Sequence, residues 1–131
     1  MEAKKIIITG GATRIGAAIA RSLSGNEKQI TLHYNQSEKE AKKLKTELER
    51  DGAKVFLIKA DLSNSNSVKK IIPFSYKMMK GLDCLINNAS IFEKDSIKDF
   101  NESKFNKHMN INLKAPAILS QAFKKYVKNN K

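Results

Sequence analysis

Glycines and an arginine follow a short apolar run near the start of the chain, in the order Thr9-Gly10-Gly11-Ala12-Thr13-Arg14-Ile15-Gly16. The run Ile6-Ile7-Ile8 before them predicts a buried strand, and the residues after them predict an amphipathic helix. Glycine lets the main chain adopt positive φ and pass close to a pyrophosphate, and the following helix directs its free N–H groups at the phosphates. The strand, turn and helix together predict a dinucleotide-phosphate site; the alternative is a tight turn without a ligand.

The end of the second apolar run indicates which dinucleotide fits. An NAD site places a carboxylate there, which binds the ribose 2′-hydroxyl and would repel a 2′-phosphate. The residues Tyr34-Asn35-Gln36-Ser37 include no acid, and Glu38 belongs to the following helix. Arg14 carries a fork of donors suited to phosphate, so these residues favour NADPH over NADH. Ser37 has two interpretations, a helix cap with Glu40 completing a capping box or a phosphate ligand, and one hydroxyl can serve both.

The elements that position these residues are expected to alternate between strand and helix along the chain. This alternation predicts a single α/β domain with a parallel sheet and right-handed crossovers. The expected strands are residues 4–9, 29–34, 54–60 and 82–87. The expected helices are residues 14–23, a segment between Ser37 and Gly52, about 65–80, and about 101–128. Pro73 should kink or split the third helix.

Two of the helices have apolar faces that can be assigned from their spacing. The first is expected to bury Ile15, Ala18, Ile19 and Leu23. The second is expected to bury Ala41, Leu44 and Leu48.

The net charge of the 131-residue chain is +12, yet its lysine pairs lie among polar residues and no aromatic residues interleave with them. Solvated helix faces are therefore expected, with a general attraction for anions and no nucleic-acid partner. Cys84 is the only cysteine and lies in an apolar run, which predicts a buried, inert thiol in a reducing compartment. No signal-peptide core, membrane-length apolar stretch or metal site is expected, and the predicted location is the cytoplasm.

Three motifs resemble those of the short-chain dehydrogenase/reductases: Thr9-Gly10-x-x-x-Arg14-x-Gly16, Asp61-Leu62 after the third strand, and Asn87-Asn88-Ala89-Ser90 after the fourth. The resemblance extends from residue 4 to the end of the chain. Within that family the chain is most similar to the pteridine reductases, on Arg14, Leu32-His33-Tyr34-Asn35-Gln36-Ser37 and the Phe92 that follows the third motif. It differs at Gln36, where pteridine reductases tend to have a second arginine, so a 2′-phosphate should be held less tightly.

The resemblance implies a Rossmann-like three-layer αβα fold with strand order 3-2-1-4, NADP(H) as cofactor, and a small-molecule substrate such as a pterin. It also implies a homo-oligomer for full-length members. The expected cofactor-binding residues are Thr9, Gly10, Arg14, Ile15, Gly16, Tyr34, Asn35, Ser37, Asp61, Leu62, Asn88, Ala89 and Ser90.

Several of these positions have a structural interpretation as well as a functional one. By resemblance Asp61 binds the adenine amino group, whereas the alternative is an N-terminal cap of the following helix. Phe92 corresponds to the aromatic residue on which the pterin ring stacks, and its alternative is a plug in the core. Asn87 is expected to tie the fourth strand to its neighbours. His33 and His108 are interpreted as structural.

Asn112 matches the catalytic asparagine of the family, whose main-chain carbonyl holds a water of the proton relay. Pro116 follows four residues later and has no N–H group, so the Asn112 carbonyl loses its helical partner. The sequence therefore predicts a free acceptor at the residue where the family's mechanism needs one.

The resemblance also implies a catalytic tyrosine with a lysine four residues later, after a fifth strand, and the chain ends at Lys131 before such a strand. Tyr76 and Lys80 have this spacing but precede the fourth strand, and Tyr126 is followed at the same spacing by Asn130. Two functions stay open: the N-terminal half of an NADPH-dependent reductase, completed by further residues or a second chain, or a non-catalytic nucleotide-binding remnant. In either case the fourth strand is expected to be an exposed edge.

Overall fold

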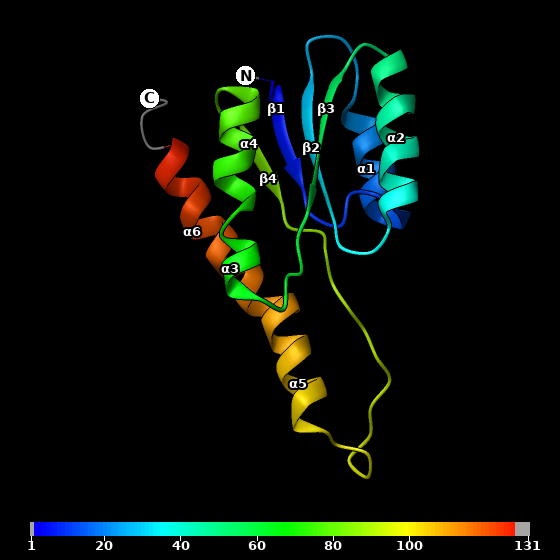
Figure 1. The fold of residues 1–131 in the computed structure, drawn as a ribbon, viewed down its shortest axis with the longest axis vertical. Coiled ribbons are helices and arrows are strands. Elements are labelled where there is room, and N and C mark those ends of the chain that lie inside the picture. Colours follow the sequence, from blue (N-terminus) through cyan, green and yellow to red (C-terminus); the bar gives the residue numbers. More distant parts are fainter. Residues whose placement is uncertain (1, 128–131) are drawn as a thin grey trace.

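The computed structural model describes residues 2–127 and has three layers, with helices on both faces of one sheet (Figure 1). The four parallel strands are β1 (Lys5–Ile8), β2 (Gln29–Tyr34), β3 (Lys54–Lys59) and β4 (Cys84–Ile86). Their order is β3-β2-β1-β4, as predicted. In the central strand, Ile7 pairs with Thr31 of β2 and with Leu85 of β4.

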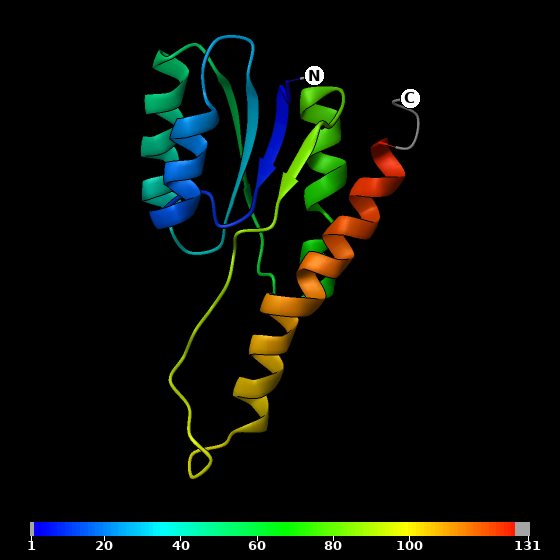
Figure 2. The ribbon, with the colours of Figure 1, turned by 180° about the vertical axis from the view of Figure 1, so that it is seen from behind.

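The helices α1 (Arg14–Leu23) and α2 (Glu38–Arg50) cover one face of the sheet. The other face is covered by α3 (Ser65–Val68), α4 (Ile71–Met79) and α6 (Ala115–Val127) (Figure 2). Beyond the carboxyl ends of the strands, a long loop leads into α5 (Glu102–Met109), which continues through the π-helical turn η1 (Asn110–Lys114) into α6. The loop and α5 therefore extend past the edge of the sheet where site residues were expected.

The isoleucines of β1 are buried on both faces of the sheet because helices cover both. Ile7 packs with residues of α3, α4 and α6, whereas Ile6 and Ile8 pack with residues of α1 and α2. The predicted stripe of α2 is confirmed: Ala41, Leu44 and Leu48 are all buried.

The predicted apolar face of α1 is partly wrong. Ile15 is 69% exposed and Ala18 is also exposed, whereas the buried residues are Gly16, Ala17 and Ala20. Small residues face the sheet because they let the helix lie close to β1 and to the glycine turn. Ile15 points instead toward the cleft described below.

The expected helix over residues 65–80 is split, as Pro73 indicated. The break falls at Lys69 and Lys70, and Pro73 occupies the first turn of α4, where its missing N–H group costs no hydrogen bond. The long last helix is likewise interrupted by η1, and its expected end at Lys128 lies outside the described residues.

Two local predictions need correction. Ser37 precedes α2 but its side chain makes no capping hydrogen bond, so the expected capping box is not formed. Cys84 is half-buried rather than buried, because β4 lies at the edge of the sheet. Burial and, to a lesser extent, the Asp83 charge raise the pKa of the Cys84 thiol, which keeps it protonated. Within residues 2–127, none of the helices combines the length and apolar character that a membrane crossing requires.

Candidate functional site

A cleft of about 730 Å³, here called the main cleft, is lined by the loops that follow the carboxyl ends of all four strands. Ligand sites of parallel α/β folds lie at this edge of the sheet. Most of the predicted cofactor-binding residues line it: Gly10, Arg14, Ile15, Tyr34, Asn35, Ser37, Asp61, Leu62, Asn88, Ala89 and Ser90.

The glycine turn is shaped by close main-chain contacts. Gly10 has φ +60°, in the left-handed region that favours glycine. A Cβ atom on Gly16 would collide with the Gly10 carbonyl oxygen and would approach Asn88 Nδ2 to 2.7 Å. Gly16 is therefore required so that the start of α1 can lie against the turn, although Gly16 itself does not line the cleft.

The N-terminus of α1 opens into the main cleft. The Ala17 N–H group donates to the Thr13 carbonyl at 3.1 Å, so the preceding N–H groups of the helix have no partner within it. Arg14 lines the cleft beside these groups and has φ +48°, a conformation that costs a non-glycine residue about 1 kcal/mol. The cleft thus combines free N–H donors, the positive end of a helix dipole and a guanidinium group, a donor set for phosphate.

Thr9 supports the site from beneath rather than lining it. Its buried Oγ1 accepts hydrogen bonds from the Asn88 N–H at 3.1 Å and the Ala89 N–H at 3.0 Å. The Asn88 side chain donates in return to the carbonyls of Thr9 and Gly10. Asn88, rather than the expected Asn87, therefore ties the end of β4 to that of β1, whereas Asn87 Nδ2 donates to Ser120 Oγ of α6.

His33 is buried under the glycine turn and holds it. Its Nε2 lies 2.8 Å from the Ala60 carbonyl, which can only accept, so Nε2 carries the proton and Nδ1 accepts from the Gly10 N–H at 3.0 Å. Burial lowers the pKa of His33 more than the Ala60 hydrogen bond raises it, which keeps the ring neutral.

Because the folded chain resists protonation of His33, we expect its stability to fall as the pH drops below 6.5, the ordinary pKa of the group. The unfolded chain then takes up a proton that the folded chain does not, and one such proton lowers the free energy of unfolding by at most about 1.4 kcal/mol per pH unit. Urea unfolding at several pH values measures it. The His33→Gln variant, which cannot titrate at this position, should lose less over the same range; equal losses in both chains would contradict the assignment.

Asp61 lies at the rim of the main cleft, after β3. Its carboxylate accepts hydrogen bonds from the Ser63 hydroxyl at 2.7 Å and the Ser63 N–H at 2.9 Å, and these bonds lower the pKa of Asp61. It does not cap α3, because Asn64 does so by accepting from the Ser67 N–H. The capping alternative for Asp61 is therefore wrong, and its contact with adenine stays a prediction.

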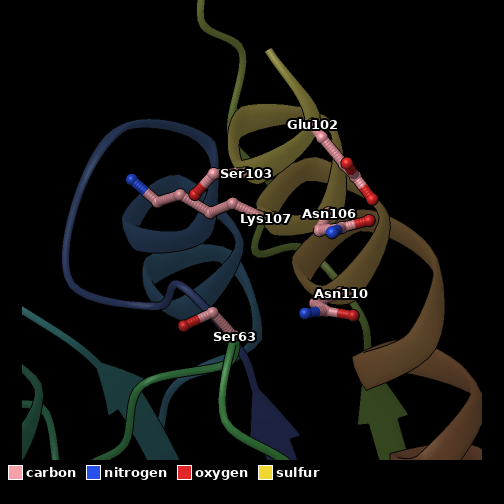
Figure 3. Close-up of a pocket in the computed structure, with 6 residues that line it drawn as sticks. All are labelled: Ser63, Glu102, Ser103, Asn106, Lys107 and Asn110. Carbon is pink, nitrogen blue, oxygen red and sulfur yellow. The ribbon is translucent and has the colours of Figure 1, made fainter.

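Lys107 of α5 is a charged residue of the site that the sequence did not identify. Its charge contributes to the lowered pKa of Asp61, and its Nζ lies 3.1 Å from Glu93 Oε1. Figure 3 shows its side chain extending past Ser103, away from Asn106 and Asn110. Lys107 lines both the main cleft and a smaller side cleft of about 610 Å³, formed with Ser63, Glu102, Ser103, Asn106 and Asn110.

The other lining residues that were not predicted are Ala12, Thr13, His33, Gln36, Ser63, Ile91 and Ile111. Ala12 and Thr13 lie inside the glycine motif, and His33, Gln36, Ser63 and Ile91 are each adjacent to a predicted position, so including the neighbours of each motif would have found them. Lys107 and Ile111 come from a distant helix, and one lysine in a lysine-rich chain carries no distinguishing pattern.

The two residues expected near the reaction centre lie in different surroundings. Phe92 is 89% exposed, so the core-plug alternative is wrong, and its contact with substrate stays a prediction. Asn112 lies in η1, where the Ala115 N–H donates to the Asn110 carbonyl five residues earlier. Its side chain makes two hydrogen bonds to the main chain of Ile91, at 2.8 and 2.9 Å. The predicted role of its carbonyl stays a prediction.

Tyr76 and Lys80 lie away from the main cleft. Lys80 follows the last residue of α4, and its carbonyl accepts a hydrogen bond from Lys5 Nζ at the start of β1. This is the amino end of the strands, opposite to the main cleft. The ring of Tyr76 packs against that of Tyr126 of α6, with centroids 4.9 Å apart. Neither residue lines the main cleft, in keeping with their position before the fourth strand.

The fold is a Rossmann-like α/β fold with a cleft at the carboxyl ends of its strands, and the family follows from comparison. The family model of the short chain dehydrogenases matches residues 4–131. The chain therefore belongs to the short-chain dehydrogenase family.

Individual relatives agree with this assignment. A short chain dehydrogenase from Burkholderia cenocepacia, in complex with NADP, is similar with a TM-score of 0.90 and 30% identity over 94% of this chain and 50% of that one. FolM alternative dihydrofolate reductase 1 from Brucella canis, complexed with NADP, is similar with a TM-score of 0.87. Its identity to this chain is 26%, over 96% of this chain and 51% of that one. Short-chain dehydrogenase/reductase FrzI from a Cladobotryum species is 28% identical over 91% of this chain and 46% of its own length. The chain spans about half the length of the curated relatives it matches.

Proposed function

We propose that the chain binds NADP(H) in the main cleft and forms the cofactor-binding part of a reductase. The observation that carries this proposal is the charge pattern of the cleft wall. Arg14 and the N-terminus of α1 lie beside Tyr34-Asn35-Gln36-Ser37, and this end of β2 presents no carboxylate that would repel a 2′-phosphate. The Burkholderia and Brucella relatives, both complexes with NADP, support the same choice of cofactor.

The residues of the cleft suit the parts of such a cofactor. Gly10 and the free N–H groups of α1 would hold the pyrophosphate, with Arg14 and Ser37 at the 2′-phosphate. Asp61 would accept from the adenine amino group, and Ala89 and Ser90 would lie beside the nicotinamide ribose. Bound NADPH supplies a hydride to the substrate.

The proposed reaction is reduction of a carbonyl or imine group, with a pterin-like ring as the favoured substrate. The exposed ring of Phe92 suits stacking on a flat heterocycle. The main-chain carbonyl of Asn112, four residues before Pro116, is proposed to hold a water of the proton relay. The similarity to FolM alternative dihydrofolate reductase 1 supports a substrate of this class, because dihydrofolate contains a pterin ring.

A second candidate function is nucleotide binding without turnover. Within residues 2–127, Tyr34 is the only tyrosine that lines the main cleft, and the residue four positions later is Glu38 rather than lysine. For the chain to serve as part of a reductase, further residues or a second chain would have to supply the tyrosine and the lysine.

Titration of the 131-residue chain with NADPH and NADH, followed by nicotinamide fluorescence, tests the proposal. We expect NADPH to bind at least about tenfold more tightly, since one charge-assisted phosphate contact contributes about 1.5–3 kcal/mol. Adenosine 2′,5′-bisphosphate should compete and 5′-AMP should compete poorly. Equal affinities would overturn the choice of NADP(H). Adding dihydrobiopterin and following NADPH oxidation then tests for turnover: oxidation of NADPH by this chain would overturn the second candidate, binding without turnover.

A further inference from the structure

One wall of the main cleft is held from outside by a helix. The segment Ser90–Glu93 leaves β4 without regular secondary structure and runs beside α5 and η1. Asn112 Oδ1 accepts from the Ile91 N–H at 2.8 Å, and Asn112 Nδ2 donates to the Ile91 carbonyl at 2.9 Å. Two residues further on, the Glu93 N–H donates to His108 Nε2 at 3.0 Å.

The spacing of these contacts matches the geometry of the two segments. Residues two apart in an extended chain are separated by about 6.6 Å. Residues four apart in an α-helix are separated by about 6.0 Å along its axis, and His108 and Asn112 are four apart across the junction of α5 with η1. One face of the helix can therefore hold Ile91 and Glu93 at the same time, with Phe92 between them.

A second hydrogen bond of His108 fixes the tautomer in which Nε2 is the acceptor. Its Nδ1 lies 2.8 Å from the Lys104 carbonyl, which can only accept, so Nδ1 carries the proton and Nε2 has a free lone pair. The ion pair of Lys107 with the Glu93 carboxylate adds a contact to the same loop residue.

Phe92 contributes little to its own placement, because its side chain is 89% exposed. Its two neighbours in the loop carry the anchors, and Ser90 and Ile91 line the main cleft. The hydrogen bonds at Ile91 alone would fix one point of the loop and leave the direction of its main chain free. The hydrogen bond at Glu93 fixes a second point, and the two points together fix that direction.

We propose that His108 is a positioning residue that holds Ser90 and Ile91, which line the main cleft, and the adjoining Phe92 in place for the bound dinucleotide. It acts through the Glu93 main chain and touches neither cofactor nor substrate. This role rests on the proposed binding of NADP(H) in the main cleft.

Three substitutions separate the hydrogen bond to Glu93 from other properties of His108. In His108→Gln the side-chain amide reaches about as far as Nε2 and keeps an acceptor for Glu93. In His108→Asn the amide reaches only as far as Nδ1, so it keeps a polar side chain but cannot reach Glu93. In His108→Leu both polar atoms are lost.

Amide spectra of the ¹⁵N-labelled chain, recorded with and without NADPH, provide the measurement. We expect the Glu93 amide to exchange about five- to tenfold faster in the Asn and Leu variants than in the parent and the Gln variant, the change that one lost hydrogen bond produces. NADPH should shift the amides of Ser90, Ile91 and Phe92 in the parent and the Gln variant. These shifts should shrink or broaden in the other two, while those of Arg14–Gly16 persist in all four chains.

The outcomes distinguish the two proposals. If NADPH shifts Arg14–Gly16 in every chain and shifts Ser90–Phe92 equally in every chain, the positioning role is wrong and cofactor binding stands. If NADPH shifts none of these amides in the parent, the proposed function fails, and the positioning role fails with it. Unchanged spectra for the sheet residues confirm that each variant is folded.

Discussion

Replacing Gly16 by alanine is expected to abolish saturable NADPH binding and to lower the free energy of unfolding. Alanine is the better helix former by about 1 kcal/mol, so propensity alone predicts a more stable chain. The new Cβ would, however, collide with the Gly10 carbonyl oxygen and approach Asn88 Nδ2 to 2.7 Å. A main-chain oxygen cannot move aside alone, and such overpacking costs about 1–3 kcal/mol. Relief of the collision has to displace the glycine turn, which is the proposed phosphate site.

The matched control is Gly25→Ala, which adds the same atom where nothing lies within 4 Å. Gly25 has φ +143°, so the variant loses stability through backbone strain alone. It should bind NADPH as the parent does. Urea unfolding and fluorescence titration of both variants measure the two effects, and a Gly16→Ala chain with parental NADPH affinity would refute the proposed placement of the phosphates.

Reversing the charge at Arg14 with Arg14→Glu is expected to weaken NADPH binding about 10- to 100-fold, because a charge-assisted contact is replaced by repulsion of the 2′-phosphate. NADH lacks this phosphate, so its affinity should stay the same or rise. The ratio of the two dissociation constants is therefore the decisive measurement.

Two further variants control for net charge and for strain. Arg50→Glu, at the far end of α2, makes the same change in net charge away from the main cleft and should leave the ratio unchanged. Arg14→Gly removes the guanidinium and relieves the left-handed conformation at φ +48°. It should lose preference for NADPH without repelling NADPH. If Arg14→Glu keeps the parental ratio, another residue selects the cofactor.

The sequence by itself determined the fold class and the end of the sheet where the site lies, and its resemblance to a family supplied the strand order. The isoleucines of β1 and the Ala41, Leu44 and Leu48 stripe of α2 have the spacing of buried elements, and local periodicity is enough to place them. The glycine motif and the residues after β2, β3 and β4 are local signals too, because each loop follows its own strand. Most of them therefore line the main cleft as expected.

Only the tertiary structure decided which side chains support the site and which line it. Ile15 is the most apolar residue at the start of α1, yet it is exposed. Gly16 faces the glycine turn instead, because only a residue without Cβ fits against the Gly10 carbonyl. The bonds of His33 to Gly10, of Asn88 to Thr9, and of His108 to Glu93 join residues far apart in sequence or on different elements. No spacing rule along the chain encodes such pairs, because they arise when the loops at the carboxyl ends of the strands are brought to one edge of the sheet.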